Sequence, residues 1–264
     1  CTVNVTVLNQ ISDGFTLKIL DPEGAACGAS DISIYGKKAD GSYAKLRTTY
    51  TTELGYARVK GLDQAYQSYR LLISGNYGAG GQVGQKGYFV YQRELGKGDL
   101  GKTLTMGKGD ARKADFQLLS AGGSPVSAPY LLLEPAYQTA GKTLGLEALS
   151  AWMVDESTPL YLEDGPYHLY GYWQPSSSDS AEPAYFLAGQ GEISQNSGKL
   201  TLSAADGTLV KPVFNTDVTG RLTLSEIPGE SNIPFVGGSI SGSSLYVTPG
   251  VYAAGAELSA THEG

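Results

Sequence analysis

Side chains that carry out chemistry are scarce in this 264-residue chain. It contains two histidines, His168 and His262, and two cysteines, Cys1 and Cys27. No C-x-x-C or H-x-x-x-H pair is present, which excludes a zinc site built from cysteine and histidine. A nucleophile–histidine–acid triad would have to use His168, and no G-x-S-x-G motif supplies a nucleophile for it. The sequence therefore predicts no catalytic residues, no cofactor and no enzymatic activity.

Charge and long apolar runs are also in short supply. Charged residues make up 17% of the chain and the net charge is −7. No run of lysine and arginine could neutralise a series of phosphates, so nucleic acid is not an expected partner. The longest apolar runs, such as residues 131–133, are too short to span a bilayer, so no transmembrane segment is expected. No charged-then-apolar leader is present, and we expect any signal peptide to have been removed.

What the chain has in quantity is glycine, tyrosine and short alternating segments. It contains 36 glycines and 18 tyrosines, and 41% of its residues are hydrophobic. Few charges with abundant glycine and tyrosine favour a β-rich extracellular protein over a cytosolic helical enzyme. Segments of alternating polarity recur about every 8–12 residues between turn signals, which is typical of sandwiches and barrels. The first predicted strand is Thr2–Leu8, and the last is Val251–Leu258.

The predicted fold class is all-β, built of tandem immunoglobulin-like or prealbumin-like β-sandwich domains with at most one short helix. The only helical candidate is Leu144–Val154, in which apolar residues approximate the spacing of a helix. The polar segment GKGDARKAD (107–115) is the best domain boundary. It separates an N-terminal β-sandwich, residues 1–108, from a C-terminal β-rich region, residues 112–264. The latter can be divided further into modules 112–205 and 206–264.

Internal similarity favours repeated modules. The segments TTELGYARVKGL (51–62) and NTDVTGRLTLSEI (215–227) each place aliphatic residues four and seven positions after a glycine. A second pair is LYLEDGPY (160–167) and LYVTPGVY (245–252), and a third is GKLTLS (198–203) and GRLTLS (220–225). Three such pairs together favour sandwich modules over a single irregular fold.

Three consecutive segments carry a resemblance to a known family. They are LKILDPEGAACGASDISIYG (17–36), TTYTTELGYARVKGL (48–62) and YRLLISGNYG (69–78). Their order of strands and turns resembles the carboxypeptidase-regulatory-like, or prealbumin-like, β-sandwich found in modules of secreted surface proteins. The likeness covers about residues 15–78 and, more loosely, 208–258. It implies a non-catalytic accessory or stalk module outside the cell, and it supplies no functional residues.

The N-terminal segment has several alternative chemical states. Cys1 can form a disulfide with Cys27, carry a lipid after lipoprotein processing, or remain a free thiol like Cys27. The first two states place the chain outside the cytoplasm, at the cell surface if Cys1 is lipidated. Asn4 begins the sequon Asn4-Val5-Thr6, which is a glycosylation acceptor if the source modifies its exports.

Two groups of residues are candidates for ligand binding. Tyr167, Tyr170, Tyr172 and Trp173 could form a sugar-stacking platform, or could pack in the core and pair across strands. Carboxylates gather at Asp155, Glu156, Glu163 and Asp164, but without the spacing of an EF-hand. We interpret them as solvated loop residues. A structural calcium site is the alternative, because calcium needs only oxygen ligands.

These patterns lead to three ranked hypotheses. The first is a structural or adhesive surface protein that associates with itself or with other surface proteins. In this hypothesis the strand TVNVTVLN (2–9) pairs with an open sheet edge, and filaments form if that edge belongs to another subunit. The second is a carbohydrate- or ligand-binding module that takes a polysaccharide. The third is a glycoside hydrolase, whose paired carboxylates would be a spatial rather than a sequence feature.

Overall fold

The computed structural model describes most of the chain, with several gaps. The described residues are 13–62, 64–78, 86–136, 138–139, 142–143, 149–153, 158–175, 182–210, 219–226, 244–249 and 252–259. Cys1, Asn4, the predicted strand Thr2–Leu8 and His262 lie outside them, as do Asp155 and Glu156.

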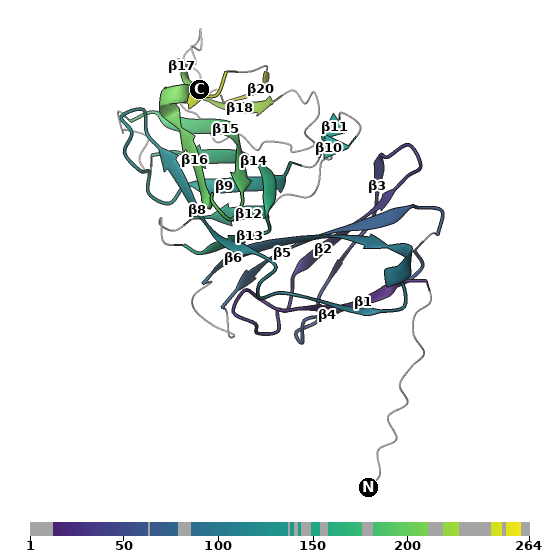
Figure 1. Ribbon diagram of the computed structural model, residues 1–264. Helices are drawn as coiled ribbons and strands as arrows, with labels where there is room; N and C mark the ends of the chain where they lie inside the picture. Colours follow the sequence, from purple (N-terminus) through teal and green to yellow (C-terminus); the bar gives the residue numbers. More distant parts are fainter. Residues whose placement is uncertain are drawn as a thin grey trace. The chain divides into compact units, whose positions relative to one another are not determined.

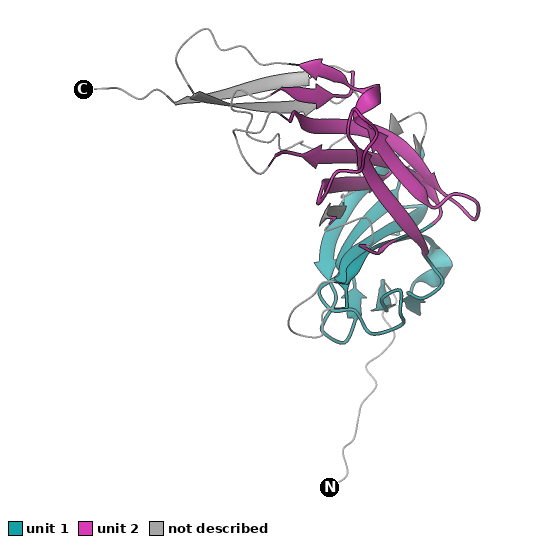
Figure 2. Cartoon of the chain, turned by 90° about the vertical axis from the view of Figure 1, so that its left-hand side faces the viewer, with its two compact units in different colours: residues 1–111, 161–163 teal, residues 112–160, 164–264 magenta. Residues whose placement is uncertain are grey.

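By contact density the chain divides into two compact units (Figure 2). Unit 1 comprises residues 1–111 together with 161–163, and unit 2 comprises residues 112–160 and 164–264. Residues 161–163, which the sequence assigned to the C-terminal region, thus belong with unit 1. The division of the C-terminal region into two modules stays a prediction.

The all-β fold class is confirmed, since in the described part of the chain every regular element apart from two 3-10 turns is a strand (Figure 1). Unit 1 contains these elements: β1 Phe15–Ile19, β2 Asp31–Lys37, β3 Tyr43–Tyr50, β4 Tyr56–Val59, β5 Ser68–Tyr77, β6 Gly87–Gly96, η1 Lys97–Asp99 and β7 Thr103–Met106. The strand β13, Leu160–Leu162, lies beside β6. The elements of unit 2 are β8 Arg112–Leu119, β9 Tyr130–Pro135, β10 Gln138–Thr139, β11 Lys142–Thr143, β12 Leu149–Trp152, β14 Gly165–Trp173, β15 Ala184–Ile193, β16 Lys199–Ser203, η2 Ala204–Asp206, β17 Thr208–Val210, β18 Thr219–Glu226, β19 Leu245–Val247 and β20 Tyr252–Ser259.

Unit 1 is a β-sandwich. Its smaller sheet has the order β4-β1-β7, with β1 antiparallel to β4 and parallel to β7. In its larger sheet the order within the unit is β13-β6-β5-β2-β3. Alternation along β1 buries Phe15, Leu17 and Ile19, which join Leu71 and Phe89 of the larger sheet in one core. Burial of these aliphatic and aromatic side chains is the main force that holds the two sheets together.

The turn between β3 and β4 shows why the sequence needs a glycine there. Gly55 has φ +75°, and a Cβ atom at this position would lie 2.4 Å from the carbonyl oxygen of Ile19. The carbonyl of Gly55 accepts a hydrogen bond from the Ile19 amide at 2.7 Å, which begins the β1–β4 ladder. Thr52 closes the turn, because its amide donates to the carbonyl of Tyr56 at 2.8 Å. Glycine is the residue that accepts both a positive φ and so close an approach of the backbone.

Unit 2 centres on a sheet with the order β12-β9-β14-β15-β19-β17. The parallel pair β8 and β16 packs on this sheet through leucines that lie directly over glycines. A Cβ atom at Gly191 would be 2.4 Å from Leu200 Cδ2, and one at Gly189 would be 2.7 Å from Leu202 Cδ2. These glycines of β15 therefore make room for the side chains of β16. The separate pair β18 and β20 is antiparallel.

The segment Leu144–Val154, the one helical candidate of the sequence, is not helical in the part that the structure describes. Residues 149–152 form strand β12, paired antiparallel to β9 with Leu149 opposite Leu133 and Trp152 opposite Tyr130. A short apolar run fits both a buried helix and a buried strand, so periodicity alone does not distinguish them. Pairing with β9 decided the outcome, and that pairing is not visible in the local pattern.

Candidate functional site

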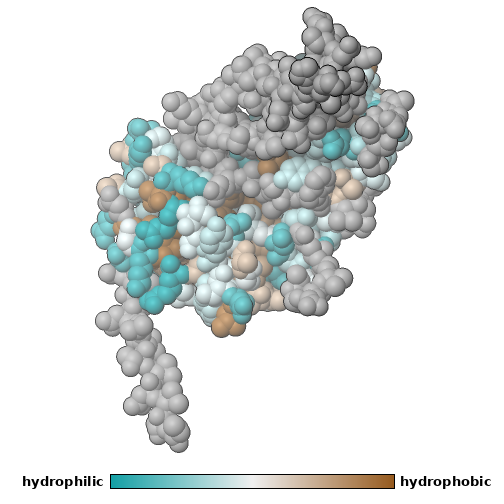
Figure 3. Space-filling view, turned by 180° about the vertical axis from the view of Figure 1, so that it is seen from behind, coloured by the Kyte–Doolittle hydropathy of each residue, from teal (hydrophilic) through white to brown (hydrophobic). Residues whose placement is uncertain are grey.

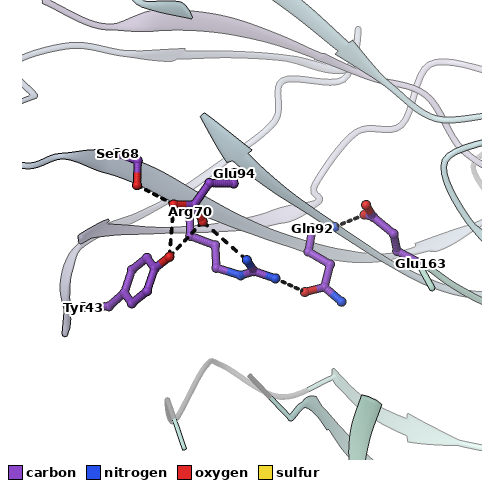
Figure 4. A network of polar contacts seen from close by, with 6 residues as sticks. All are labelled: Tyr43, Ser68, Arg70, Gln92, Glu94 and Glu163. Carbon is purple, nitrogen blue, oxygen red and sulfur yellow. Dashed lines mark hydrogen bonds and ion pairs between the residues drawn. The ribbon is translucent and has the colours of Figure 1, made fainter. Parts of the chain in front are cut away.

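A polar network of charged and hydroxyl groups lies on β3, β5 and β6 of unit 1 (Figure 4). Glu94 of β6 is its hub and lies directly opposite Arg70 of β5. The Tyr43 hydroxyl donates to both Glu94 carboxylate oxygens, at 3.0 and 2.9 Å, and the Ser68 hydroxyl donates to Oε1. Arg70 Nη1 contacts Oε2 at 3.4 Å, and its Nη2 donates to the side-chain oxygen of Gln92 at 2.6 Å.

The network ends at Glu163, the residue that follows β13. Its carboxylate accepts a hydrogen bond from the backbone amide of Gln92, and its own amide donates to the carbonyl of Val90 at 3.2 Å. Glu163 thus continues the hydrogen bonding between β13 and β6 one residue beyond the end of β13. Burial raises the pKa of Glu163, while the Gln92 amide and nearby Arg93 act in the opposite direction.

The side chains of this network contact one another across adjacent strands. The side chain of Arg70 is 12% exposed and that of Glu94 is 36% exposed, and each is engaged by neighbours on adjacent strands. Together the contacts join β3, β5, β6 and the segment 161–163. We therefore interpret the network as a structural one, because its charged groups are directed at each other.

Of the carboxylates that the sequence singled out, the described two also have protein partners. Glu163 binds the backbone of β6 as described above, and Asp164 accepts a hydrogen bond from Arg112 Nε. Within the described residues no group of three or more histidine, cysteine, aspartate or glutamate side chains could hold a metal ion.

The aromatic residues of β14 do not gather on one surface. Tyr167 is fully buried and Tyr170 is 6% exposed, and alternation directs them to opposite faces of the sheet. Tyr172 packs against the small cluster of Phe186, Leu245 and their neighbours. The sugar-stacking role stays a prediction; of the four residues, Tyr172 and Trp173 are the two that are only partly buried.

Trp173 belongs to a ladder of rings that crosses three strands. It lies opposite Tyr185 of β15, and Tyr185 lies opposite Tyr246 of β19. Ring centroids are 5.4 Å apart in the first pair and 5.8 Å apart in the second, with interplanar angles of 30° and 28°. The faces of Tyr185 are thus directed at the neighbouring rings. Such cross-strand aromatic pairs stabilise a sheet.

His168 is half-buried in β14, between Glu134 of β9 and Gln190 of β15 in the strand register. Glu134 is fully buried. The sequence identified the histidine but missed this carboxylate. The feature of the sequence that could have indicated Glu134 is that it is the single acidic residue in the apolar segment YLLLEP (130–135).

Cys27 is a buried free thiol at the edge of the unit 1 core. Its Sγ donates to the carbonyl of Asn76 at 3.4 Å. Burial raises the pKa of Cys27, and the nearby Asp21 carboxylate acts in the same direction. Cys1 lies outside the described residues, so the predicted disulfide and lipid states stay predictions.

Large exposed apolar side chains are few among the described residues. They are Tyr50, Leu54, Tyr56, Leu209 and Val210. On the face shown in Figure 3, apolar side chains form small patches between polar ones. No helix in the described part of the chain is long and apolar enough to cross a membrane.

Comparison with known proteins yields only distant structural likenesses. No family profile matches the chain, and no curated protein matches it. A point mutant of the shaft pilin SpaA from Lactobacillus rhamnosus GG has 11% identity and a TM-score of 0.23, covering 72% of this chain and 97% of that one. A streptococcal ancillary pilin has 13% identity and a TM-score of 0.23, covering 72% of this chain and 62% of that one. The Bacillus anthracis TIE protein has 10% identity and a TM-score of 0.24, covering 93% of this chain and 43% of that one.

Proposed function

We propose that this chain is a non-catalytic, extracellular structural or adhesive surface protein. Its composition supports this function, because low charge with abundant glycine and tyrosine is typical of extracellular β proteins. The observation that carries the proposal is that charged side chains of the described residues pair with one another and so link parts of the fold. Arg70 with Glu94, Arg93 with Asp110, and Arg112 with Asp164 are all paired in contacts that join strands and turns.

Assembly by exchange of the N-terminal strand is the mode we propose. Residues 1–12 contain no charged side chain, and Val3, Val5 and Val7 alternate with polar residues. Such a segment is suited to pair with the edge of a sheet, where alternate side chains enter the core. Pairing with the edge of a neighbouring copy would give head-to-tail growth.

The edge strand β3 is the acceptor that we favour in unit 1. It has eight residues, whereas the edge strands β4 and β7 of the smaller sheet have four each. Leu46 of β3 is partly buried and packs against the core. An incoming strand could therefore extend that core by placing its valines beside Leu46.

Deletion of residues 1–9 tests this mode of assembly. We expect the shortened chain to remain folded and monomeric, while the full chain forms fibres visible by electron microscopy. A synthetic peptide of residues 1–9, added in excess, should block growth of the full chain by occupying the acceptor edge. A peptide with the three valines replaced by serine is the matched control.

Two results would count against strand exchange. If the shortened chain unfolds, the segment pairs within its own subunit. If the full chain and the shortened chain assemble equally well, the contact between subunits lies elsewhere.

A further inference from the structure

The outer face of the sheet β4-β1-β7 differs in charge from the chain as a whole. Alternation directs Phe15, Leu17 and Ile19 of β1 into the core and leaves Thr16 and Lys18 on the other side. On β4, Ala57 and Val59 are buried whereas Tyr56 and Arg58 are exposed.

The register of the three strands makes these outer residues contiguous. Thr16 lies opposite Arg58 on one side and Thr103 on the other. Lys18 lies opposite Tyr56 and Thr105 in the same way. We call these six residues the basic face: Thr16, Lys18, Tyr56, Arg58, Thr103 and Thr105. It contains two cations, three hydroxyls, one phenol and no carboxylate, in a chain whose net charge is −7.

Neighbouring groups add to this positive charge. Lys60 follows β4 and continues its alternation, and it is exposed. Within the described part of the chain, neither Arg58 nor Lys60 forms an ion pair. A carboxylate lies beside Lys60: that of Asp13 accepts a hydrogen bond from the Gly61 amide at 3.2 Å.

Lys18 is held in place on this face. Its ammonium lies 4.1 Å from the centroid of the Tyr56 ring and donates to the carbonyl of Leu54. A cation fixed over an aromatic ring loses less side-chain freedom on binding than a lysine that extends into solvent. The face is thus partly organised for an anion.

The edge of β4 argues against a bound peptide strand. Its first residue, Tyr56, already has both backbone groups engaged by Thr52, through the side-chain oxygen at 3.2 Å and the amide at 2.8 Å. The remaining edge is too short for strand addition. What the face offers is a set of cations and hydroxyls on an open surface. These are the groups that bind the carboxylates and hydroxyls of a sugar polymer.

We propose that the basic face binds an anionic polysaccharide that carries carboxylates. Arg58, Lys60 and Lys18 would contact the carboxylates, and the threonine hydroxyls would exchange hydrogen bonds with the sugar hydroxyls. The inference is independent of strand exchange, because it involves none of residues 1–9.

The test measures binding of the full chain to polygalacturonate, with neutral dextran as the comparison polymer. We expect binding to polygalacturonate that weakens as salt is added, because exposed charges are screened. The double variant Arg58→Gln/Lys60→Gln should bind about five- to tenfold more weakly, since two exposed charge contacts are lost. Lys38→Gln/Lys45→Gln is the matched control: it removes the same charge from exposed positions of the β2–β3 hairpin, and its affinity should be unchanged.

A second variant examines the hydroxyls without altering charge. Thr103→Val/Thr105→Val retains the shape of both side chains and should weaken binding about two- to fivefold. The thermal melting of all three double variants verifies that the fold is intact.

Three results would each overturn the proposal. The first is absence of binding to polygalacturonate. The second is an equal loss of affinity in Arg58→Gln/Lys60→Gln and in its control Lys38→Gln/Lys45→Gln. The third is tighter binding to duplex DNA than to polygalacturonate. The last would make the basic face a nucleic-acid surface instead.

Discussion

At the scale of single residues, burial raises the pKa of several groups in the described part of the chain. Burial raises the pKa of Cys27, Glu163 and Tyr185, and it is the largest cause in each case. Exposed carboxylates behave in the opposite way. A hydrogen bond from Ser42 lowers the pKa of Asp40, and one from Lys102 lowers the pKa of Asp99.

The first prediction concerns Cys27. Because its raised pKa and its burial both disfavour the thiolate, the reduced folded chain should react with iodoacetamide at neutral pH at least about tenfold more slowly than the chain in denaturant. Equal rates in the two states would contradict the buried position. A digest of the unreduced chain tests the predicted disulfide separately, through a peptide that joins Cys1 and Cys27.

The second prediction concerns Glu163 and pH. A raised pKa means that the folded chain binds this proton more tightly than the unfolded chain. The free energy of unfolding contributed by Glu163 therefore increases as the pH falls through its folded pKa, and the unfavourable contribution is complete at pH values above it.

Urea unfolding of Glu163→Gln from about pH 4 to pH 8 examines this sign, because about pH 4 is near the ordinary glutamate pKa. We expect the variant to gain stability relative to the natural chain as the pH rises, since its amide stays neutral and its oxygen can still accept from Gln92. Asp164→Asn is the control, from which this trend should be absent. A difference that does not change with pH would refute the prediction.

At the scale of elements, cross-strand polar contacts join strands that are distant in sequence. Glu94 accepts hydrogen bonds from Tyr43 of β3 and from Ser68 of β5, in addition to its contact with Arg70. By comparison, Glu23 forms an exposed ion pair with Lys86. The side chain of Lys86 is 57% exposed and that of Glu23 is 54% exposed.

The third prediction follows from this contrast. Glu94→Ala should lower the free energy of unfolding by about 1–2 kcal/mol, because it removes the carboxylate that accepts from two hydroxyls and pairs with Arg70. Glu23→Ala should change it by less than about 0.5 kcal/mol, as expected for an exposed pair. Chemical denaturation of both variants provides the comparison, and equal losses would show that the network adds nothing beyond a surface ion pair.

At the scale of the whole molecule, unit 1 is completed by a segment from far along the chain. Tyr161 contacts Tyr77 edge to face, with ring centroids 5.8 Å apart. Glu163 binds β6 through both its amide and its carboxylate. Residues 161–163 thus cover an edge of β6 that a fragment ending at residue 111 would expose.

The fourth prediction is that a fragment of residues 13–111 is less stable than the same fragment with residues 158–164 attached by a flexible linker. If the attached segment contributes about 1 kcal/mol, the melting temperature should rise by about 4–8 °C for a domain of this size. A control carries Tyr161→Ser and Glu163→Ser in the attached segment. Identical melting of all three fragments would mean that the segment does not stabilise unit 1.

Local pattern predicted the strands of this protein well. The strands Thr103–Met106 and Lys199–Ser203 coincide with segments of alternating polarity. Asp21 and Gly24, within the segment LKILDPEGAACGASDISIYG (17–36), form a turn in which the Gly24 amide donates to the Asp21 carbonyl at 2.9 Å. These features depend on side-chain alternation and on backbone torsions within a few residues, and both can be read from neighbouring letters.

Strand partners and shared surfaces could not be predicted in this way. The sequence did not reveal that β1 pairs with β7 or that residues 149–152 would be strand. Nor did it reveal the basic face, because Lys18, Arg58 and Thr105 come from three separate segments. Which strands meet depends on the total apolar surface that each arrangement buries and on the loops that it closes, and neither quantity belongs to a single segment.

The sequence by itself determined the β class, the alternating faces and the glycine turns, since each of these follows from short-range sterics and periodicity. Tertiary structure alone decided which polar groups meet: Glu94 with Arg70, Glu163 with β6, and cations beside threonines on β4-β1-β7. The physical reason is that polar contacts act over a few ångströms in space, whereas the residues that form them are separated by tens of positions along the chain.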